Sequence, residues 1–321
     1  MSPPLVVSVR VPASTSNLGC GFDVFGLALS FSNELHLGPS PDGRWSVEIR
    51  GEGATTLPRD RKNLVIGALR SAGTRFGVRF MPMRITMVNR IPLARGLGSS
   101  AAAATAGVAA AAFLSPRRPS FDRILSEIAR IEGHPDNAAA ALLGGFVASY
   151  RAGSSFVPRR LPLHSGLRVA LAIPDFGLQT KRARAILPHR VPLEDAVFNL
   201  SRTALLPEAL RTGRYGDLSD LLDDRLHQDR RAHLIPGMRQ ALRAAPKSGA
   251  FGAFLSGGGS STAAFAPPSR AQAVALAMCR GFESSGRSAR PLVLRPDLRG
   301  AQVRFGRSPW RPIHSALAHI T

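Results

Sequence analysis

The sequence predicts an α+β fold with two lobes. Strand-like and helix-like segments are interleaved along the chain, but they do not form a regular strand–helix–strand series. The chain has 321 residues, which is enough for one large domain or two of ordinary size. We therefore expect an N-terminal lobe over residues 1–160 and a C-terminal lobe over residues 161–321, which meet near residues 155–195.

In the N-terminal half, apolar β-branched runs indicate strands, and apolar spacings of three and four indicate helices. The strands are expected at residues 5–11, 83–88 and 144–150. Two helices are expected at residues 62–76 and 99–114. A third helix follows Ser120, whose hydroxyl suits an N-cap. Its apolar face is made of Phe121, Ile124, Leu125, Ile128 and Ile131.

The C-terminal half follows the same patterns. A strand is expected at residues 168–173. Two more strands, at residues 251–255 and 261–265, are expected on either side of a run of glycines. Helices are expected at residues 196–210, 218–226 and 271–282.

The composition, with 44% hydrophobic and 20% charged residues, is that of a soluble globular protein. The longest apolar run, residues 101–114, is shorter than the roughly 20 residues of a membrane-spanning helix. The first residues lack a basic segment followed by an apolar one, so no secretory signal is expected. Cys20 and Cys279 are too far apart in sequence for a disulfide framework or a metal motif. We expect a cytoplasmic protein without a membrane partner.

The net charge of +21 raises the question of a nucleic-acid partner. Only three of the 42 basic residues are lysines (Lys62, Lys181 and Lys247), and the other 39 are arginines spread along the chain. Aromatic residues make up 6%, which leaves few platforms for base stacking. We interpret the charge as a general arginine bias that helps attract anionic substrates, and we expect no nucleic-acid partner. Nucleic-acid binding is kept as the alternative from a different class.

Residues 92–102 are the most informative segment, because glycines and serines connect a predicted strand to a long helix. Gly96 and Gly98 let the backbone turn with its N–H groups exposed. The start of the following helix adds free N–H groups and the positive end of its dipole. Such a segment suits the phosphates of a nucleotide, and the hydroxyls of Ser99 and Ser100 suit phosphate oxygen or magnesium.

This segment has other interpretations. A glycine turn with a serine cap on a core helix is the plain structural one. A Walker A loop is excluded, because no Gly-Lys-Ser/Thr follows. Residues 96–101 match the loose dinucleotide fingerprint. However, that fingerprint requires a strand after the helix, and residues 115–119 lead into another helix instead.

Three further segments indicate a binding site. Residues 11–29 place small polar residues and glycines after a strand, and Asp23 then stands among apolar neighbours, as in a loop that closes on a ligand. Residues 132–137 bring Glu, His, Asp and Asn together after a helix, which suits either a magnesium site or a capped turn. Residues 257–259 are three successive glycines, which indicates close approach to another loop or a phosphate.

In this order, the four segments resemble the GHMP kinases, a family named for galactokinase, homoserine kinase, mevalonate kinase and phosphomevalonate kinase. Within the family, the match is closest to the homoserine kinases. The resemblance continues through residues 180–188, 224–228 and 231–237 and covers the chain to about residue 295.

The resemblance implies a two-lobed fold of mixed sheets packed against helices. The N-terminal lobe would bind ATP, and the C-terminal lobe would complete the acceptor site. It also implies an ATP-dependent kinase that uses Mg²⁺ and converts L-homoserine to O-phospho-L-homoserine in threonine biosynthesis. A homodimer is a possibility that the sequence leaves open. A kinase for another small alcohol, such as mevalonate, is the alternative within the family.

The resemblance also implies roles for particular residues around ATP. The phosphates would be wrapped by Pro92, Leu93, Ala94, Arg95, Gly96, Leu97, Gly98, Ser99, Ser100, Ala101 and Ala102. Ser100 would reach the magnesium ion, and Glu132 would be its acidic ligand, with Glu127 on the same helix as the second candidate.

A second set of residues would surround the amino acid, namely Asn17, Asp23, His134 and Asn137. Asp23 would face the ammonium group, and Thr180 would lie near the phosphoryl acceptor. Arg184 and Arg231 would hold the carboxylate, which suits the geometry of a guanidinium.

The chain departs from the family at three places. Asp229 and Arg230 stand where Pro-Tyr is usual, so either Arg230 or Arg231 could be the carboxylate ligand. Residues 139–140 are Ala-Ala instead of Pro-Ala, and residues 260–261 are Ser-Ser instead of Pro-Thr. Some relatives use an Asp as base on the acceptor hydroxyl. That position falls on Asp136 or Asn137 here, and Asn cannot take a proton. Since the homoserine kinases resemble a base-free design, Asp136 is kept as a candidate base only.

Overall fold

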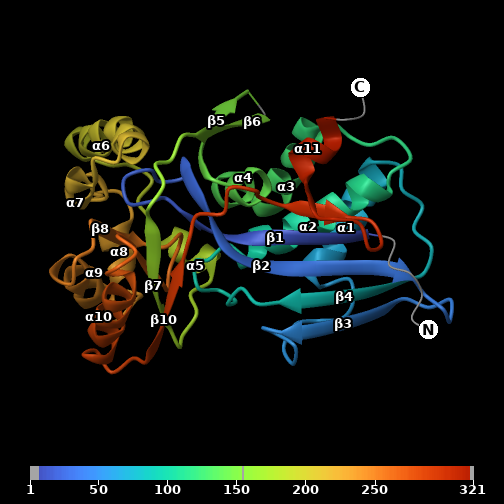
Figure 1. Cartoon of the computed structure of the whole chain (residues 1–321), viewed down its shortest axis with the longest axis horizontal. Helices are drawn as coiled ribbons and strands as arrows, with labels where there is room; N and C mark the ends of the chain where they lie inside the picture. Colours follow the sequence, from blue (N-terminus) through green and yellow to red (C-terminus); the bar gives the residue numbers. More distant parts are fainter. Residues whose placement is uncertain (1–6, 154, 319–321) are drawn as a thin grey trace.

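Two β-sheets, each packed against helices, form the two lobes of the molecule in the computed structural model, which describes residues 7–153 and 155–318 (Figure 1). This confirms the predicted α+β architecture of sheets packed against helices, although only the larger sheet is mixed. The first two residues of the strand expected at 5–11 lie outside the described residues.

The larger sheet belongs mainly to the N-terminal half. Its strands are β1 (Val7–Ser16), β2 (Phe25–Pro39), β3 (Ser46–Gly51), β4 (Met83–Asn89), β5 (Phe146–Ala152), β6 (Ser155–Leu161), β11 (Gln302–Arg304) and β12 (Arg311–Pro312). They run in the order β12-β11-β1-β2-β4-β3, and β5 joins β2 to β6. β3 and β4 are parallel and the other pairs are antiparallel, so the sheet is mixed. β2 is long enough to pair with β5 near its start and with β4 near its end.

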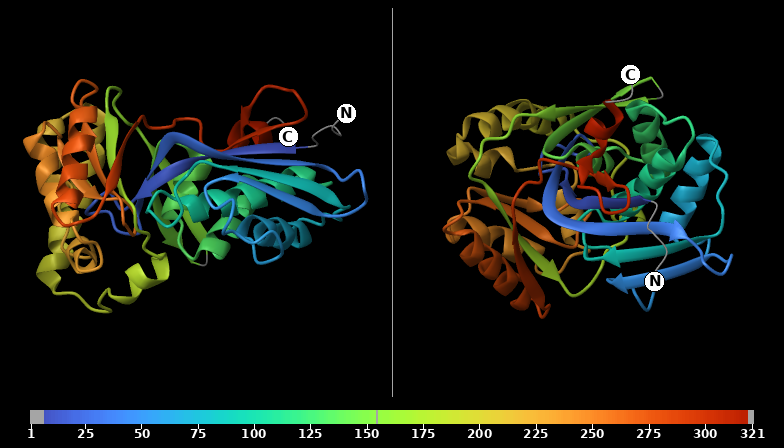
Figure 2. Two further views of the ribbon diagram at one scale, coloured as in Figure 1. Left: turned by 90° about the horizontal axis from the view of Figure 1, so that it is seen from below. Right: turned by 45° about the vertical axis from the view of Figure 1, so that its right-hand side comes forward.

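Helices cover one face of this sheet (Figure 2). They are α1 (Leu64–Arg75), α2 (Ser99–Leu114), α3 (Phe121–Glu132) and α4 (Asp136–Leu143), with α11 (Ile313–Ala318) at the far end. α2 is buried on almost every side, because its alanines let β1, α1 and α4 pack closely around it. At Gly107, a Cβ would collide with the backbone of α1. Ser120 caps α3 as predicted, by accepting a hydrogen bond from the Arg123 N–H.

The smaller sheet lies in the C-terminal half and is antiparallel, with the order β10-β7-β9-β8. Its strands are β7 (Arg168–Pro174), β8 (Gly252–Leu255), β9 (Thr262–Ala266) and β10 (Ala289–Leu294). The helices of this half are α5 (Thr180–Ala185), α6 (Leu193–Thr212), α7 (Leu218–Leu221), α8 (Gln228–Ala232), α9 (Met238–Lys247) and α10 (Ala271–Glu283), with a 3₁₀ turn at Tyr215–Asp217.

α9 and α10 pack on the smaller sheet around an apolar core that includes Val274, Met278 and Phe282. After β10 the chain returns to the larger sheet and adds β11, β12 and α11. The boundary at residue 160 stays a prediction. In the part of the chain that the structure describes, no helix is long and apolar enough to cross a membrane.

Two local predictions were wrong for physical reasons. The helix expected over 218–226 ends at Leu221, because the buried Asp224 carboxylate accepts N–H groups of Leu226, His227 and Gln228 and so starts α8. The polar loop expected after residue 11 is instead the end of β1, which continues to Ser16. Its hydroxyls have partners: Ser14 donates to Asn137 Oδ1, and the hydroxyl oxygens of Thr15 and Ser256 lie 2.8 Å apart.

Candidate active site

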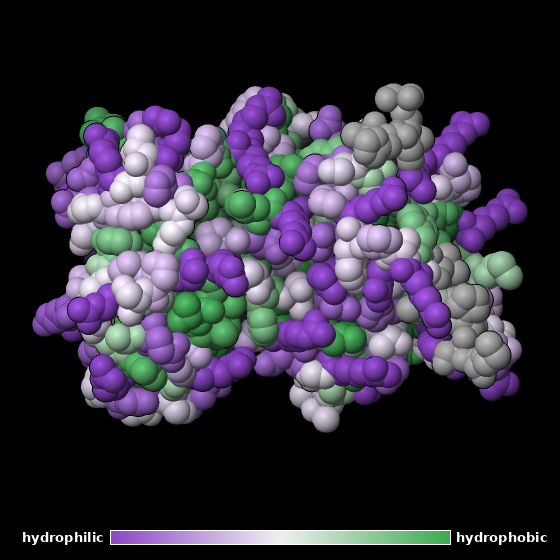
Figure 3. All heavy atoms as spheres, viewed as in Figure 1, coloured by the Kyte–Doolittle hydropathy of each residue, from purple (hydrophilic) through white to green (hydrophobic). Residues whose placement is uncertain are grey.

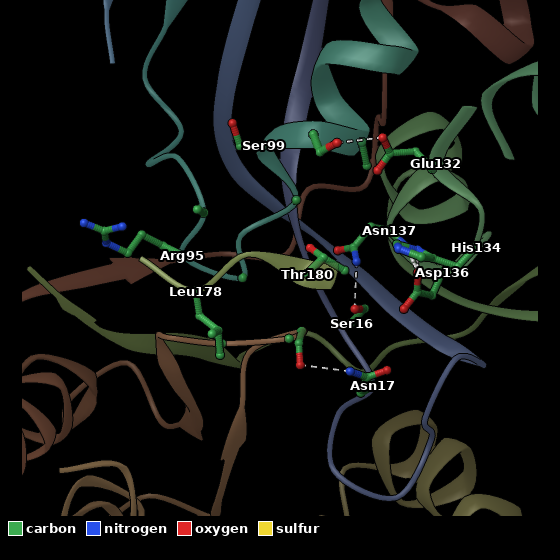
Figure 4. Close-up of a pocket in the computed structure, with 18 of the residues that line it drawn as sticks. Ser16, Asn17, Arg95, Ser99, Glu132, His134, Asp136, Asn137, Leu178 and Thr180 are labelled. Atoms are coloured by element: carbon green, nitrogen blue, oxygen red, sulfur yellow. Dashed lines mark hydrogen bonds and ion pairs between the residues drawn. The ribbon is translucent and has the colours of Figure 1, made fainter. Parts of the chain in front are cut away.

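A pocket lies where the two lobes meet (Figure 4). The predicted acceptor and catalytic residues all line it: Asn17, Asp23, Glu132, His134, Asp136, Asn137, Thr180, Arg184 and Arg231. So does part of the predicted phosphate loop, namely Ala94, Arg95, Gly96, Gly98, Ser99, Ser100 and Ala101. Pro92, Leu93, Leu97 and Ala102 do not line this pocket, and Leu97 and Ala102 are buried in the core.

The loop before α2 depends on two glycines. Gly96 and Gly98 have φ values of 71° and 70°, a region that L-residues with side chains rarely adopt. A Cβ at Gly98 would also collide with Ser14 of β1, and one at Gly96 would collide with the Ser256 carbonyl. Gly98 is the N-cap of α2, so the first N–H groups of that helix open toward the pocket.

The glycine run at residues 257–259 approaches this loop, as its sequence predicted. The Ser256 hydroxyl donates to the Gly96 carbonyl at 2.7 Å, and the Gly257 N–H donates to the Ser16 carbonyl at 3.2 Å. Gly257, Gly258 and Gly259 all line the pocket. The run therefore joins the smaller sheet to the phosphate loop.

Glu132 and Ser100 contact each other at the start of α2. The Ser100 hydroxyl donates to Glu132 Oε1 at 2.7 Å. Burial raises the pKa of the Glu132 carboxyl, although the hydrogen bond from Ser100 opposes this. Glu132 takes part in none of the ion pairs among the described residues, and the charged form of His134 nearby lowers its pKa without outweighing burial. A carboxylate and a hydroxyl without a nearby arginine or lysine form an oxygen site that suits a hard cation.

Glu127, the second candidate acid, lies outside this pocket. Its carboxylate is bound by Arg130 at 2.8 Å, by Arg75 at 3.1 Å and by the Ser71 hydroxyl at 2.8 Å. These partners hold its pKa below the ordinary value despite burial. Its oxygens are therefore already occupied by neighbouring side chains.

His134, Asp136 and Asn137 form the side of the pocket at the start of α4. His134 Nδ1 lies 3.0 Å from Asp136 Oδ1, and this bond raises the pKa of the imidazole. Burial works to raise the pKa of Asp136, but His134 and the Asn137 N–H outweigh it, and that pKa is lowered. Asn137 bridges two hydroxyls of β1, accepting from Ser14 at 2.9 Å and donating to Ser16 at 2.8 Å.

The turn between β1 and β2 presents Asp23. Asn17 shapes this turn, because its Oδ1 accepts the Asp23 N–H at 3.0 Å while its Nδ2 donates to the Gly257 carbonyl at 2.9 Å. The Asp23 carboxylate faces Arg184 of α5, which donates from both terminal nitrogens at 2.6 and 2.9 Å. The residues predicted to bind an ammonium and a carboxylate therefore pair with each other in this structure.

Arg231 lies deeper in the same pocket and is 2% exposed. Its guanidinium donates to the Ala183 carbonyl, the Gly257 carbonyl and the His227 ring. Burial, with Arg184 nearby, lowers its pKa to about 10, so it remains charged at neutral pH. Arg230 is exposed and does not line the pocket, so the geometry favours Arg231 of the two arginines.

Arg95 lines the pocket but directs its side chain away from the other labelled residues in Figure 4. The guanidinium donates to the carbonyls of Leu93, Pro174 and Asp175 at 2.7–3.0 Å. It thus ties the phosphate loop to the end of β7.

A second, more apolar cavity adjoins the first and shares Ala94, Ser99, Ser100, Leu178 and Thr180 with it. Its remaining walls include Leu57, Asn63, Leu64, Val65, Met87, Leu93 and Ala103. The predicted Leu93 therefore lies at this cavity, which the sequence did not predict.

Sequence reasoning also missed other lining residues. Ser16 lies within the polar segment at residues 11–29, but nothing in the sequence distinguishes it from Ser14. Leu178 carries no chemical signal and lines the pocket only because the segment after β7 passes it. The run of three glycines predicts that residues 257–259 closely approach another part of the molecule. The sequence does not say that this part is the loop before α2.

A fold of this topology, with a glycine–serine loop that opens onto a pocket between its lobes, is the arrangement expected of a GHMP kinase. Two segments match family models: residues 63–145 match the GHMP kinases N terminal domain, and residues 206–284 match GHMP kinases C terminal. A homoserine kinase of Carboxydothermus hydrogenoformans is 42% identical over 297 residues, which cover 92% of this chain and 96% of the relative. One from Thermus thermophilus is 43% identical over 256 residues, which cover 80% and 85%. The chain belongs to the homoserine kinase family of the GHMP kinases.

Solved structures agree with this family. The homoserine kinase from Cytophaga hutchinsonii superposes with a TM-score of 0.84 at 29% identity, covering 95% of this chain and 98% of that one. A mevalonate kinase superposes with a TM-score of 0.66 at 13% identity, covering 90% and 99%, and shares the fold alone.

Proposed function

We propose that this chain transfers the γ-phosphoryl group of ATP to the hydroxyl of L-homoserine, giving O-phospho-L-homoserine, ADP and a proton. The observation that carries the proposal is the pocket itself. Arg184 and Arg231 supply cations, Asp23 supplies an anion, and the helix start at Ser99 lines the same pocket. L-Homoserine carries a carboxylate that suits the arginines, an ammonium that suits Asp23, and a primary hydroxyl that can face the phosphates at the helix start.

ATP fits the two adjoining cavities. The helix start and the backbone of residues 96–101 take the phosphates, because free N–H groups and the helix dipole favour negative charge. The apolar cavity between α1, β4 and α2 takes the nucleoside. The two share Ser99 and Ser100, where the triphosphate would pass from one to the other.

Ser100 and Glu132 would hold Mg²⁺. The fit rests on two oxygen donors 2.7 Å apart and on a partly buried carboxylate that no arginine or lysine among the described residues pairs with. Those residues contain no cluster of three or more His, Cys, Asp or Glu suited to a metal. This agrees with Mg²⁺, which takes one or two carboxylates and completes its shell with phosphate and water. When bound, the ion neutralises phosphate charge.

The chain's own residues then act mainly by positioning, which is the chief requirement of phosphoryl transfer. Asp136 is the candidate base, but its lowered pKa makes it a weak proton acceptor. Asn137, fixed by Ser14 and Ser16, would orient the acceptor from the same wall. Thr180 starts α5 and would lie beside the acceptor hydroxyl. We therefore favour the base-free design.

A coupled ADP-release assay with a panel of alcohols tests the proposal. L-Homoserine should give the highest kcat/KM, ahead of mevalonate, L-serine and L-threonine, in the presence of Mg²⁺. A better rate with mevalonate would overturn the homoserine assignment while leaving a GHMP kinase. Absence of ADP release with every alcohol would overturn both.

The basic residues support a substrate-attracting field better than a nucleic-acid interface. Arginine occurs along the whole sequence, and hydrophilic side chains of all kinds are scattered across the face shown in Figure 3. We propose a cytoplasmic enzyme without a nucleic-acid or membrane partner. A salt-titrated assay with random DNA and RNA checks this, because phosphate contacts give a steep salt slope.

We also propose that α6 pairs with α6 of a second copy. Leu193, Val197, Leu200 and Ala204 are exposed at spacings of four, three and four, which is the seam of a helix pair. Apolar side chains reach the surface at the upper left of Figure 3, where α6 lies in Figure 1.

Charge favours a second copy as the occupant. Residues 189–212 carry three acidic and three basic residues, whereas the chain carries 21 and 42, so this segment adds no net charge to the repulsion between copies. Light scattering after gel filtration should show a dimer that Leu200→Glu dissociates. Leu276→Glu on α10 is the matched control, since Leu276 is also an exposed leucine on a helix. A monomeric wild type would overturn this proposal.

A further inference from the structure

His227 is a buried histidine that the proposed reaction does not use. It precedes α8, and Arg231 lies one helical turn later on the same helix. The His227 side chain is fully buried. Its Nε2 lies 2.9 Å from the Gly19 carbonyl oxygen, and its Nδ1 lies 2.9 Å from Nη1 of Arg231.

These two contacts fix the form of the ring. A carbonyl oxygen can only accept, so Nε2 must carry the hydrogen. A guanidinium can only donate, so Nδ1 must be bare. The imidazole is therefore the neutral Nε2–H tautomer. Burial points the same way, since it lowers the pKa of His227 to about 4, with Arg231 adding to the effect and Asp224 and Asp23 opposing it.

Each hydrogen-bond donor of the Arg231 guanidinium can also be assigned to its acceptor. Nε donates to the Ala183 carbonyl at 3.2 Å, and Nη1 is shared between His227 and the Gly257 carbonyl at 3.3 Å. Nη2 has no protein acceptor among the hydrogen bonds of the described residues, and Arg231 lines the pocket. The two N–H bonds of Nη2 are thus the ones left for a ligand.

Phe22 closes this arrangement from the side. Its ring stacks on the His227 ring with centroids 5.2 Å apart, and the guanidinium carbons of Arg184 and Arg231 lie 5.6 and 5.4 Å from its centre. Asp224 is the other charged group beside the imidazole, 3.7 Å from Nε2. Its carboxylate is already occupied by backbone N–H groups and by Asn199. It therefore supports the backbone of α8 and leaves the ring to Gly19 and Arg231.

We infer that His227 is a positioning residue for substrate recognition: by accepting Nη1 of Arg231, it orients Nη2 toward the carboxylate of the acceptor. This inference rests on the proposed function, since the carboxylate is that of homoserine. It gives His227 a role that depends on one ring nitrogen, Nδ1, and not on the charge of the ring.

Two substitutions separate the ring nitrogens. In His227→Asn, the amide oxygen can stand at the position of Nδ1, so the acceptor for Arg231 is kept and the donor to Gly19 is lost. In His227→Gln, the amide nitrogen can reach the position of Nε2, so the donor to Gly19 is kept and the acceptor is lost. His227→Gln should raise KM for L-homoserine at least tenfold, and His227→Asn should raise it less than threefold. For both variants, KM for ATP should stay within threefold of the wild type. His189→Gln, at an exposed histidine, is the matched control.

A merely structural role is excluded by two further readouts. In the Arg231→Ala background, His227→Gln should have no additional effect on KM for L-homoserine, because the group on which it acts is gone. With 3-aminopropan-1-ol, which lacks the carboxylate, His227→Gln should leave kcat/KM unchanged. Equal KM values for the Gln and Asn variants, additive effects with Arg231→Ala, or an equal loss with the amino alcohol would overturn the inference.

Nitrogen-15 NMR of the histidine rings gives a readout that needs no substrate. His227 should remain the neutral Nε2–H tautomer at pH 6, and a protonated ring at that pH would overturn the inference whatever the enzyme phosphorylates. A wild type that shows this tautomer but does not phosphorylate homoserine would overturn the proposed function alone.

Discussion

Asp23 and Arg184 face each other across the pocket with nitrogen–oxygen distances of 2.6 and 2.9 Å, although they lie 161 residues apart in the chain. They are the residues proposed for the ammonium and the carboxylate of the acceptor. The ion pair keeps the pocket electrically balanced before substrate arrives. A zwitterionic amino acid can replace each partner with a group of the same charge, whereas mevalonate has a carboxylate but no ammonium and can replace only Asp23. The pair therefore favours an amino-acid acceptor.

Arg184→Ala should raise KM for L-homoserine and leave KM for ATP nearly unchanged. The hydrogen bonds of a charged group typically contribute about 1.5–3 kcal/mol, which corresponds to roughly 10- to 150-fold in KM. Arg231→Ala should behave in the same way. Steady-state kinetics with each substrate varied in turn measures this.

Arg230→Ala is the control for these variants, because Arg230 is exposed beside Arg231 and lies outside the pocket. It should leave both Michaelis constants within about threefold of the wild type. A larger effect for Arg230 than for Arg231 would show that the substrate carboxylate binds one residue earlier in the chain than we propose.

Glu132→Gln should lower kcat, because the amide cannot supply the negative charge that Mg²⁺ needs beside Ser100. Loss of one group that stabilises transition-state charge typically costs on the order of 10²–10³-fold. Glu127→Gln is the matched control on the same helix, where the carboxylate binds Arg75 and Arg130. It should leave kcat within about threefold but lower the free energy of unfolding by about 1–2 kcal/mol. The reverse ranking in kcat would identify Glu127 as the functional acid.

The sequence alone could not decide between these two glutamates. They are five residues apart on α3, and at 3.6 residues per turn they point in clearly different directions. Choosing one requires the placement of α3 against α2, which depends on packing between distant segments. The same limit applies to Arg95, whose acceptors Pro174 and Asp175 lie about 80 residues further along the chain.

Local signals did predict much of the fold. α2 begins at Ser99 and ends at Leu114 as expected, because the glycine loop and an alanine run mark it clearly. β2 was missed because its start is buried on both faces and only its second half alternates, so no single period marks all 15 residues. The motifs located the candidate site residues, whereas the apolar cavity that we propose for the nucleoside is lined mainly by residues that carry no motif.

Ala103→Leu tests that apolar cavity. Ala103 lines it from α2 and does not line the acceptor pocket, and leucine is well tolerated in helices. The larger side chain should fill space needed by the nucleoside and raise KM for ATP about tenfold or more, while KM for L-homoserine changes little. Calorimetric titration with ATP gives the affinity directly. Unaltered affinity would mean that the nucleoside binds elsewhere.

The stability of the free enzyme should also depend on Glu132. Burial raises the pKa of this carboxyl in the folded protein, so the folded state binds the proton more tightly than the unfolded chain does. The destabilising effect of the charge is therefore absent below the unfolded pKa, about 4.3, and develops as the pH rises.

Glu132→Gln removes this effect, so the variant should melt at a higher temperature than the wild type near pH 7, and the difference should shrink toward about pH 4. Thermal melts in chelator without nucleotide measure it. Excess Mg²⁺ with ATP should then stabilise the wild type more than the variant. A variant that is less stable than the wild type at pH 7 in chelator would contradict the assignment of an unpaired carboxylate.

Gly98→Ala tests whether the glycine loop serves the nucleotide as well as the fold. The residue has a φ of 70°, and its added Cβ would collide with Ser14 of β1. Gly77→Ala is the matched control, because Gly77 has a φ of 72° but no atom within 4 Å of the added Cβ.

The left-handed conformation alone costs roughly 1–2 kcal/mol for a residue with a side chain, so both variants should lose at least about that much stability. Gly98→Ala should lose more, because Ser14 or the start of α2 must move. That movement displaces the N–H groups proposed for the phosphates, so ATP affinity should fall in Gly98→Ala and stay unchanged in Gly77→Ala. If both variants melt earlier and both bind ATP as the wild type does, the loop is a structural turn and the phosphates bind at another part of the pocket.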